Sequence, residues 1–123
     1  MTRADLSPGY QATQATHAGL KFARLYPDRL ASWFDNSNCL VVLASPDEET
    51  LSLLATQLKD EGFVVERFHE PDIGNELTAI ALAPADTLAT RLSTLPLALR
   101  TRDPRSTRER RLHEQHKLRE ASA

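Results

Sequence analysis

Four polar residues near the N-terminus have types and spacings that could form a binding or catalytic site. Tyr10, Gln14, His17 and Lys21 are separated by four, three and four residues, so on a helix they line one face. A histidine can accept a proton near neutral pH, and a nearby carboxylate could orient its ring. Ester hydrolysis needs such a base to activate water, together with donors for a tetrahedral oxyanion. The same spacing also fits an ordinary solvated helix face, so both interpretations stay open.

The helix that would carry these side chains begins with a typical opening signal. Ser7 can cap free amides, and Pro8 suits the first helical turn. Small and aromatic residues then recur at three- and four-residue spacings, so we expect a helix from about Gly9 to Leu25 with this stripe roughly opposite the polar face. Pro27 interrupts that helix and can begin a second, shorter one. The stripe consists of Ala12, Ala15, Gly19, Phe22 and Tyr26.

The middle of the chain predicts a strand followed by a helix. The apolar run Cys39–Ala44 indicates a strand that is buried on both faces and central in its sheet. After it, Ser45, Pro46 and Glu48 fit an N-cap, a first-turn proline and a capping-box glutamate. A helical stripe follows and ends at Gly62, a typical C-cap residue. The members of this stripe are Leu51, Leu54, Ala55 and Leu58.

Two further strands and a last helix complete the expected fold. Phe63–His69 and Leu77–Leu82 have the composition and length of strands, and a polar connection lies between them. Leucines in Pro84–Leu95 predict a last helix. This order fits one layered α/β domain, in which a small mixed sheet of about three to four strands is flanked by helices.

The overall composition fits one ordinary domain. The chain has 123 residues, of which 41% are apolar and 26% are charged, close to the averages for soluble globular proteins. No apolar run approaches the roughly 20 residues that a membrane span requires, and the N-terminus lacks the features of a secretory signal. We therefore expect a cytoplasmic protein without membrane contact. Cys39 is the only cysteine, which excludes an internal disulfide and a multi-cysteine zinc site.

Charge divides the chain into two parts. Residues 1–99 carry seven Lys/Arg and thirteen Asp/Glu, a net charge of −6, while residues 100–123 carry eight and four, a net charge of +4. We predict a folded domain over residues 1–99 and a disordered or partly helical tail over residues 100–123. Because an acidic body is not typical of a nucleic-acid binder, any RNA contact would come from a local basic patch or from the tail. The tail has a second interpretation as a weak electrostatic arm for RNA phosphates.

Three segments within residues 5–84 resemble the type 2 peptidyl-tRNA hydrolases. The first, at residues 5–18, has an Asp-Leu pair, a glycine, and then Gln14, His17 and Ala18. The second, at residues 41–51, is similar to the family's valine-rich strand and the Pro-Asp-Glu-Glu-Thr-Leu helix start that follows it. The third, at residues 78–84, looks like the family's terminal Thr-Val-Leu-Gly-Ile-Gly-Pro strand. The order and spacing of the three segments favour kinship over chance.

This resemblance implies a fold and an activity. The family has a four-stranded mixed sheet with helices on both sides and cleaves the ester between a peptide and the terminal ribose of tRNA. It therefore implies hydrolysis of peptidyl-tRNA without a metal or organic cofactor, with peptidyl-tRNA or another tRNA as the partner. A homodimer is a further expectation, because an unpaired sheet edge would favour pairing with a second copy.

The resemblance also suggests roles for the candidate residues. We hypothesise that His17 is the general base and that Asp72 or Glu70 orients it; the sequence does not choose between the two carboxylates. Thr78 and Gln14 would donate hydrogen bonds, which adds Thr78 to the catalytic set. The candidate substrate-binding residues are Gln14, Tyr10 and Lys21.

Departures from the family pattern keep other functions open. Only residues 1–4 precede the Asp-Leu pair, so the first strand is truncated, the start codon is misassigned, or another segment fills its place. Two family lysines fall at Tyr10 and Ala44, and Lys21 and Arg24 could replace them. His69 is a second candidate base that no family position supports. The alternatives are a catalytically inactive family member that binds tRNA ends or a protein, and a regulatory module whose tail binds a partner.

Overall fold

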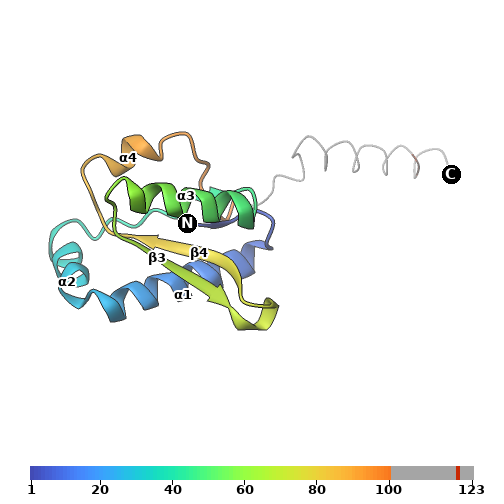
Figure 1. The fold of residues 1–123 in the computed structure, drawn as a ribbon, viewed down its shortest axis with the longest axis horizontal. Coiled ribbons are helices and arrows are strands. Elements are labelled where there is room, and N and C mark those ends of the chain that lie inside the picture. The colour runs from blue at the N-terminus through green and yellow to red at the C-terminus, as the bar shows by residue number, and fades with distance from the viewer. Residues whose placement is uncertain (101–118, 120–123) are drawn as a thin grey trace.

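A computed structural model of the chain describes residues 1–100 and residue 119 (Figure 1). Apart from Arg100 and Arg119, the tail predicted over residues 100–123 lies outside the described residues. The elements follow the expected order, with a short first strand and a 3-10 turn added. They are β1 (Thr2–Arg3), α1 (Pro8–Leu25), α2 (Pro27–Asn36), β2 (Ala44–Ser45), α3 (Glu48–Asp60), β3 (Val65–Glu70), η1 (Pro71–Ile73), β4 (Glu76–Leu82) and α4 (Leu88–Arg91).

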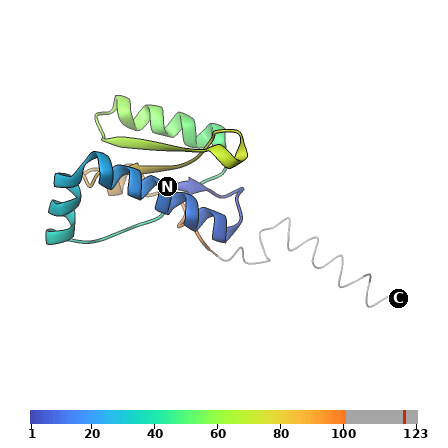
Figure 2. The same cartoon turned by 90° about the horizontal axis from the view of Figure 1, so that it is seen from below.

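The four strands form one mixed sheet in the order β2-β1-β4-β3. Strand β1 pairs in parallel with β2 and antiparallel with β4, and β3 pairs antiparallel with β4. Helix α1 packs on one face of the sheet and α3 on the other, as Figure 2 shows. The predicted α/β class and small mixed sheet are thus confirmed.

The main hydrophobic core lies between α3 and the sheet. The α3 stripe contributes Leu51, Ala55 and Leu58, all with 0% exposure, as its spacing predicted. They pack with Leu77 and Ile80 of β4 in one cluster. The core therefore holds β4 in place, and β4 carries one of the candidate site residues on its other side.

The predicted ends of α1 are also confirmed. The Ser7 side chain accepts a hydrogen bond from the Tyr10 amide, and Pro8 occupies the first turn. Helix α2 begins at Pro27 as expected. The start of α1 follows from its serine cap, and the start of α2, which has no side-chain cap, follows from the proline in its first turn.

The predicted strand Cys39–Ala44 is wrong in length, position and burial. Only Ala44 and Ser45 form β2, which lies at the edge of the sheet next to β1. Leu40 is 77% exposed and Val41 57% exposed. The short β1 explains why the strand is so short. Because β1 has only two residues, only two residues of the neighbouring segment can form backbone hydrogen bonds with it. On the other side of β2, residues 96–98 form two backbone hydrogen bonds with this segment. The Ala44 amide donates to the Pro96 carbonyl (2.9 Å), and the Ala98 amide donates to the Val42 carbonyl (2.8 Å).

Two helix predictions also need correction. Asp47, not Ser45, caps α3, and its carboxylate accepts from the Thr50 amide at 2.8 Å. This bond lowers the pKa of Asp47. Ser45 is instead buried in β2, paired with Arg3. The last helix, expected over Pro84–Leu95, is the single turn Leu88–Arg91. Its leucines still pack against the core, but turns on either side of this short helix place them there.

The first strand of the sheet is built from the first residues of the chain. Thr2 and Arg3 form β1 between β2 and β4, so the short strand fills this place. The amino group of Met1 donates to the Ile80 carbonyl at 2.7 Å. Burial lowers the pKa of this amino group to about 6, which links the stability of the N-terminal strand to pH. Among the described residues, no helix is long and apolar enough to cross a membrane.

Candidate functional site

The polar face of α1 packs against the sheet, contrary to the interpretation that it is an ordinary solvated face. Gln14 is fully buried, together with Gln11, Ala18 and Phe22. Phe22 is the only buried member of the Ala/Phe stripe defined above. Strands β3 and β4 supply polar partners to Gln14 and Lys21 on this face, and these partners offset part of the cost of removing its side chains from water.

A bulge in β4 brings Thr78 to Gln14. Phe68 pairs with Ala79 while His69 pairs with Leu77, so Thr78 is the extra residue of β4. Bulges re-aim side chains in this way. The Thr78 hydroxyl donates to Gln14 Oε1 at 2.7 Å, and both side chains are 0% exposed. Gln14 Nε2 is buried as well and has no hydrogen-bond partner among the described residues.

His17 lies one turn further along α1, beside Glu70 at the end of β3. Its Nδ1 is 3.9 Å from Glu70 Oε2, which is beyond the roughly 3.2 Å of a hydrogen bond. The His17 side chain is 40% exposed, whereas that of Glu70 is 8% exposed. Because Nδ1 itself is buried, the exposed part of the ring is its other edge, which carries Nε2. The Phe68 ring lies 4.7 Å from the imidazole, centroid to centroid.

The two candidate carboxylates occupy different surroundings. Side chains alternate between the two faces of a strand, and Glu70 follows Phe68 on the α1 face. Asp72 lies in η1 and is exposed. Glu70 Oε2 lies 3.9 Å from His17 Nδ1, and among the described contacts Asp72 makes none with His17. The geometry therefore brings His17 and Glu70 together and leaves Asp72 outside this pair.

Tyr10 lies at the other end of the same helix face. Partial burial raises the pKa of its hydroxyl, and nearby carboxylates raise it further. The carboxylates are those of Glu70, Asp72 and Glu76. The hydroxyl is therefore protonated near neutral pH and can donate a hydrogen bond.

Lys21 contacts the sheet. Its ammonium donates to the Arg67 carbonyl at 2.7 Å and lies 3.8 Å from Glu66 Oε2. Its side chain is still 44% exposed. Arg24, the other predicted replacement for a family lysine, is exposed in the last turn of α1.

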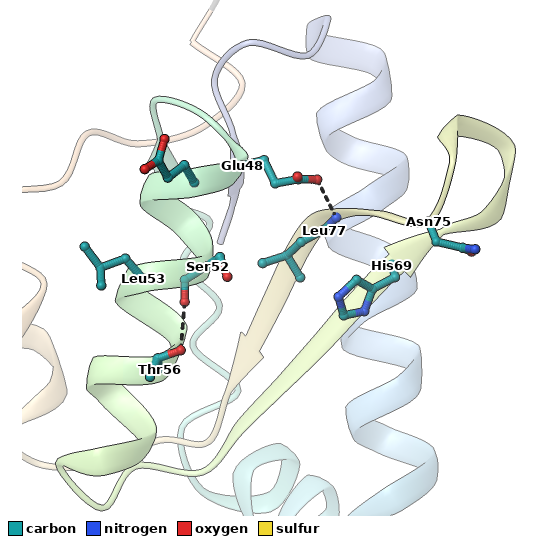
Figure 3. Close-up of a pocket in the computed structure, with 8 residues that line it drawn as sticks. Glu48, Ser52, Leu53, Thr56, His69, Asn75 and Leu77 are labelled. Atoms are coloured by element: carbon teal, nitrogen blue, oxygen red, sulfur yellow. Dashed lines mark hydrogen bonds between the residues drawn. The ribbon is translucent and has the colours of Figure 1, made fainter.

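His69 lies on the opposite side of the sheet from His17. It lines an open groove of about 670 Å³ between α3 and the β3–β4 turn (Figure 3). Residues around it include Glu48, Ser52, Thr56 and Asn75. The two candidate bases thus belong to different surfaces of the molecule.

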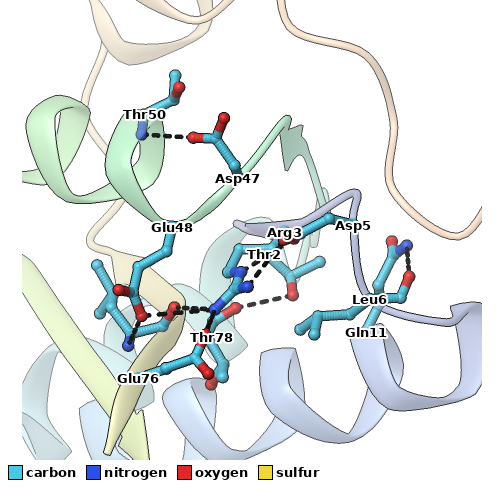
Figure 4. A network of polar contacts seen from close by, with 11 residues as sticks. Thr2, Arg3, Asp5, Leu6, Gln11, Asp47, Glu48, Thr50, Glu76 and Thr78 are labelled. Carbon is cyan, nitrogen blue, oxygen red and sulfur yellow. Dashed lines mark hydrogen bonds and ion pairs between the residues drawn. The ribbon is translucent and has the colours of Figure 1, made fainter.

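A buried arginine that the sequence interpretation missed closes the end of the sheet. Arg3 is 7% exposed, and its guanidinium donates two bonds to Asp5, at 2.9 and 2.8 Å. It also donates to Glu76 Oε1 at 2.8 Å and lies 3.5 Å from Glu48 Oε2 (Figure 4). The hydrogen bonds that Arg3 donates to the Asp5 carboxylate raise the pKa of Arg3 further above its usual value. The sequence signal was an arginine two residues before the aspartate of the Asp-Leu pair.

This network fixes the start of β4. Glu48 accepts from the Leu77 amide at 2.8 Å, and Arg3 donates to the Leu77 carbonyl at 3.2 Å. The first turn of α3, strand β1 and the residue before Thr78 are thereby connected. The bulge that aims Thr78 at α1 is held from its other side by charged groups.

Within residues 1–100 and at residue 119, no group of three or more His, Cys, Asp or Glu side chains is arranged to hold a metal ion.

Comparison with known proteins gives one family match. A family model described as peptidyl-tRNA hydrolase PTH2 matches residues 2–98. A search of curated proteins gives no match. The matched range includes every candidate site residue named above, from Tyr10 to Thr78.

Proposed function

This chain belongs to the peptidyl-tRNA hydrolase PTH2 family, and from that premise we propose that it cleaves the ester between a peptide and tRNA with His17 as the general base. The observation that carries the proposal is the position of the imidazole between Glu70 and solvent. Nδ1 faces the buried carboxylate at 3.9 Å, and the opposite edge of the ring is open. A base so placed can meet a water molecule at Nε2.

Glu70 is the orienting acid in this proposal. A carboxylate near Nδ1 favours the tautomer that carries its proton there and leaves Nε2 free to accept one. It also stabilises the imidazolium that forms when water is deprotonated. A shortening of the 3.9 Å separation by less than 1 Å would bring the two groups into hydrogen-bond range. The Phe68 ring restricts the imidazole from the side.

In the proposed reaction, His17 is the only side chain that accepts and returns a proton. Nε2 removes a proton from water as the water oxygen bonds to the ester carbonyl carbon, and the carbonyl electron pair moves onto its oxygen. When the resulting oxyanion collapses, the bond to the ribose oxygen breaks, and that oxygen takes the proton from His17. The products are the peptide acid and tRNA with a free ribose hydroxyl.

Tyr10 is the proposed donor to the oxyanion. Its hydroxyl is protonated near neutral pH, since burial and nearby carboxylates raise its pKa further above the ordinary value. A hydrogen-bond donor to developing negative charge lowers the barrier. This role replaces the family lysine that is missing here. Lys21 is the proposed contact for a more distant part of the substrate, because its ammonium is partly exposed on the same face.

Gln14 and Thr78 are assigned a positioning role. Both side chains are fully buried and bonded to each other, so direct donation to a substrate requires a local opening between α1 and β4. In the closed arrangement they fix the register of α1 against β4, and with it the distance between His17 and Glu70.

The test is single-turnover release of peptide from peptidyl-tRNA by wild type, His17→Ala and His69→Ala. General acid–base catalysis typically contributes about 10²- to 10⁴-fold, and a loss of that size is expected for His17→Ala. His69→Ala is the matched control, because this histidine lies across the sheet. An unchanged rate in folded His17→Ala would remove the proposal, and a loss in His69→Ala alone would move the site to the groove.

A specific observation favours the noncatalytic alternative. The position of the second family lysine is Ala44, which is 4% exposed within β2. A cation is therefore absent there, and the buried site could not accept one without rearrangement. The alternative predicts tRNA-end or protein binding by wild type with no peptide release, which the same assay detects when binding is measured alongside.

A further inference from the structure

Three cations of the acidic body are not engaged by the protein itself. Residues 1–99 have a net charge of −6 and contain seven Lys/Arg. Four of the seven donate side-chain hydrogen bonds to oxygen atoms of the protein. The other three are exposed and form no hydrogen bond or ion pair with described residues; they are Arg24, Arg29 and Lys59. Because phosphate neutralisation supplies most of the sequence-independent affinity for nucleic acid, the positions of these three side chains bear on where the body holds RNA.

Two of the three lie at the end of the helix that carries His17. Arg24 follows His17 by seven residues, so it lies on the same side of α1 about 10 Å further along the axis. Arg29 lies in the first turns of α2, which begins where α1 ends (Figure 1). Lys59, by contrast, lies in the last turn of α3, on the other face of the sheet. The free cations on the α1 face therefore extend from the candidate site toward α2.

A chain of contacts joins Arg29 to the candidate site. Lys21 Nζ lies 3.8 Å from Glu66 Oε2, and the Tyr26 hydroxyl donates to Glu66 Oε1 at 2.9 Å. This hydrogen bond raises the pKa of Tyr26, and the charge of Arg29 acts on the same hydroxyl in the opposite direction. Arg29 is therefore close to Tyr26, at the end of the polar face that begins at Tyr10.

Beside Arg29, one face of α2 borders a small hollow of about 220 Å³, here called the α2 hollow. No residue of α2 is buried, so the described part of the chain leaves this helix largely uncovered. Residues 29, 32, 33 and 36 share one helix face by their spacing, and all four line the hollow. The complete lining is Arg29, Ser32, Trp33, Asn36, Ser37 and Pro84.

The α2 hollow offers the contacts that a nucleotide needs. Its volume is below the roughly 300–1,000 Å³ of pockets for drug-sized ligands, which suits one planar group. The Trp33 indole is held in place by a hydrogen bond from Nε1 to the Cys39 carbonyl at 2.7 Å, and an indole is a stacking surface for any base. Arg29 supplies the cation that an adjoining phosphate requires. The two acids of α2, Asp28 and Asp35, do not line the hollow.

We propose that the α2 hollow binds a nucleotide in the single-stranded end of the tRNA, with its base on Trp33 and the adjoining phosphates on Arg29 and Arg24. The inference rests on the proposed function, because it assigns how the RNA part of the same substrate is held. The ester at His17 belongs to the terminal ribose, so the base in the hollow comes from a nucleotide before the terminal one. The strand runs from His17 past Arg24 to α2.

The test measures the affinity of the full-length chain for a short single-stranded RNA with the 3′-terminal sequence of tRNA, between 50 and 200 mM salt. Arg29→Gln removes a phosphate contact, and Lys59→Gln is the matched control because Lys59 is equally free but lies on α3. Trp33→Leu removes the aromatic surface. Trp33→Phe keeps an aromatic ring but also loses the hydrogen bond to Cys39, so it separates stacking from a purely structural role.

Arg29→Gln should reduce the slope of log affinity against log salt by about 0.7, and Lys59→Gln should leave the slope unchanged. Trp33→Leu should weaken binding by about 5- to 150-fold, and Trp33→Phe by much less. Equal losses in the two Trp33 variants would overturn the proposal, because they would assign Trp33 to holding Cys39. A wild-type slope in Arg29→Gln, or no binding of this RNA by wild type, would also overturn it.

Peptide release from peptidyl-tRNA by wild type is measured in parallel. RNA binding that follows these expectations without any peptide release would count against the proposed function and uphold the α2 hollow as an RNA site. Peptide release by wild type with no effect of Arg29→Gln or Trp33→Leu on RNA affinity would uphold the proposed function and overturn this inference.

Discussion

Replacing Glu70 by glutamine tests whether this carboxylate acts on His17. The substitution keeps the size of the side chain and removes its charge. Glu70 is the carboxylate that pairs with His17 among the described residues, and its side chain is 8% exposed. We therefore expect a lower rate of peptide release, because the imidazolium formed during the reaction loses its negative partner.

The size of the effect follows from the geometry. At 3.9 Å, two unit charges interact by about 4 kcal/mol at an effective dielectric constant of about 20. The His17 side chain is 40% exposed, and solvent screening reduces this to about 1–2 kcal/mol. Since about 1.4 kcal/mol is a tenfold change in rate, the rate constant should fall by about 5- to 30-fold.

The assay is single-turnover peptide release with enzyme in excess, and Asp72→Asn is the matched control. Both variants lose one negative charge within a few residues of each other, so a general change in the field around the RNA affects both. Only the loss of the His17 partner is specific to Glu70→Gln. The reasoning is refuted if Asp72→Asn slows release as much as Glu70→Gln does, or if folded Glu70→Gln reacts at the wild-type rate.

Three further predictions concern stability. Thr78→Val leaves the buried Gln14 oxygen without its donor and should lower the free energy of unfolding by about 1–3 kcal/mol. Adding Gln14→Leu to this variant should recover much of the loss. Urea denaturation of the two single variants and the double variant measures both effects. Burial lowers the pKa of the Met1 amino group from 8.0 to about 6. The unfolded chain therefore binds more protons between these values, and the free energy of unfolding should rise by about 2 kcal/mol from pH 6 to pH 8. One glycine added before Met1 should abolish that step, and a step that persists would assign it to other groups. Arg3→Met leaves three carboxylates without their shared cation and should lower the free energy of unfolding by about 1–3 kcal/mol; an unchanged urea midpoint would show that the network contributes nothing to stability.

The parts of the fold that depend on local chemistry could be predicted from the sequence. Ser7 and Pro8 define the start of α1, and the α3 stripe through Leu51 and Leu58 is buried as its spacing indicates. The run Cys39–Ala44 was misassigned because the burial of a strand depends on its partner, and β1 offers only two residues. The residues of the run Cys39–Ala44 contain no information on the length of β1.

The candidate site divides in the same way. Strand alternation brings Glu70 to the face of Phe68, so the carboxylate nearest His17 could have been inferred once β3 was known to extend to residue 70. The Gln14–Thr78 bond could not, because it depends on a bulge, which is a property of the register between two strands. Arg3 was missed because a charged residue in so short a strand gives no periodic signal.

Chemical rescue tests the central claim most directly. His17→Ala opens a space at a partly exposed position, and added imidazole can enter it and act as the missing base. The account predicts that imidazole restores part of the lost rate of peptide release in His17→Ala and does not accelerate wild type. A folded His17→Ala variant that releases peptide at the wild-type rate without imidazole, or stays inactive at every imidazole concentration while wild type is active, would contradict a general-base role for His17.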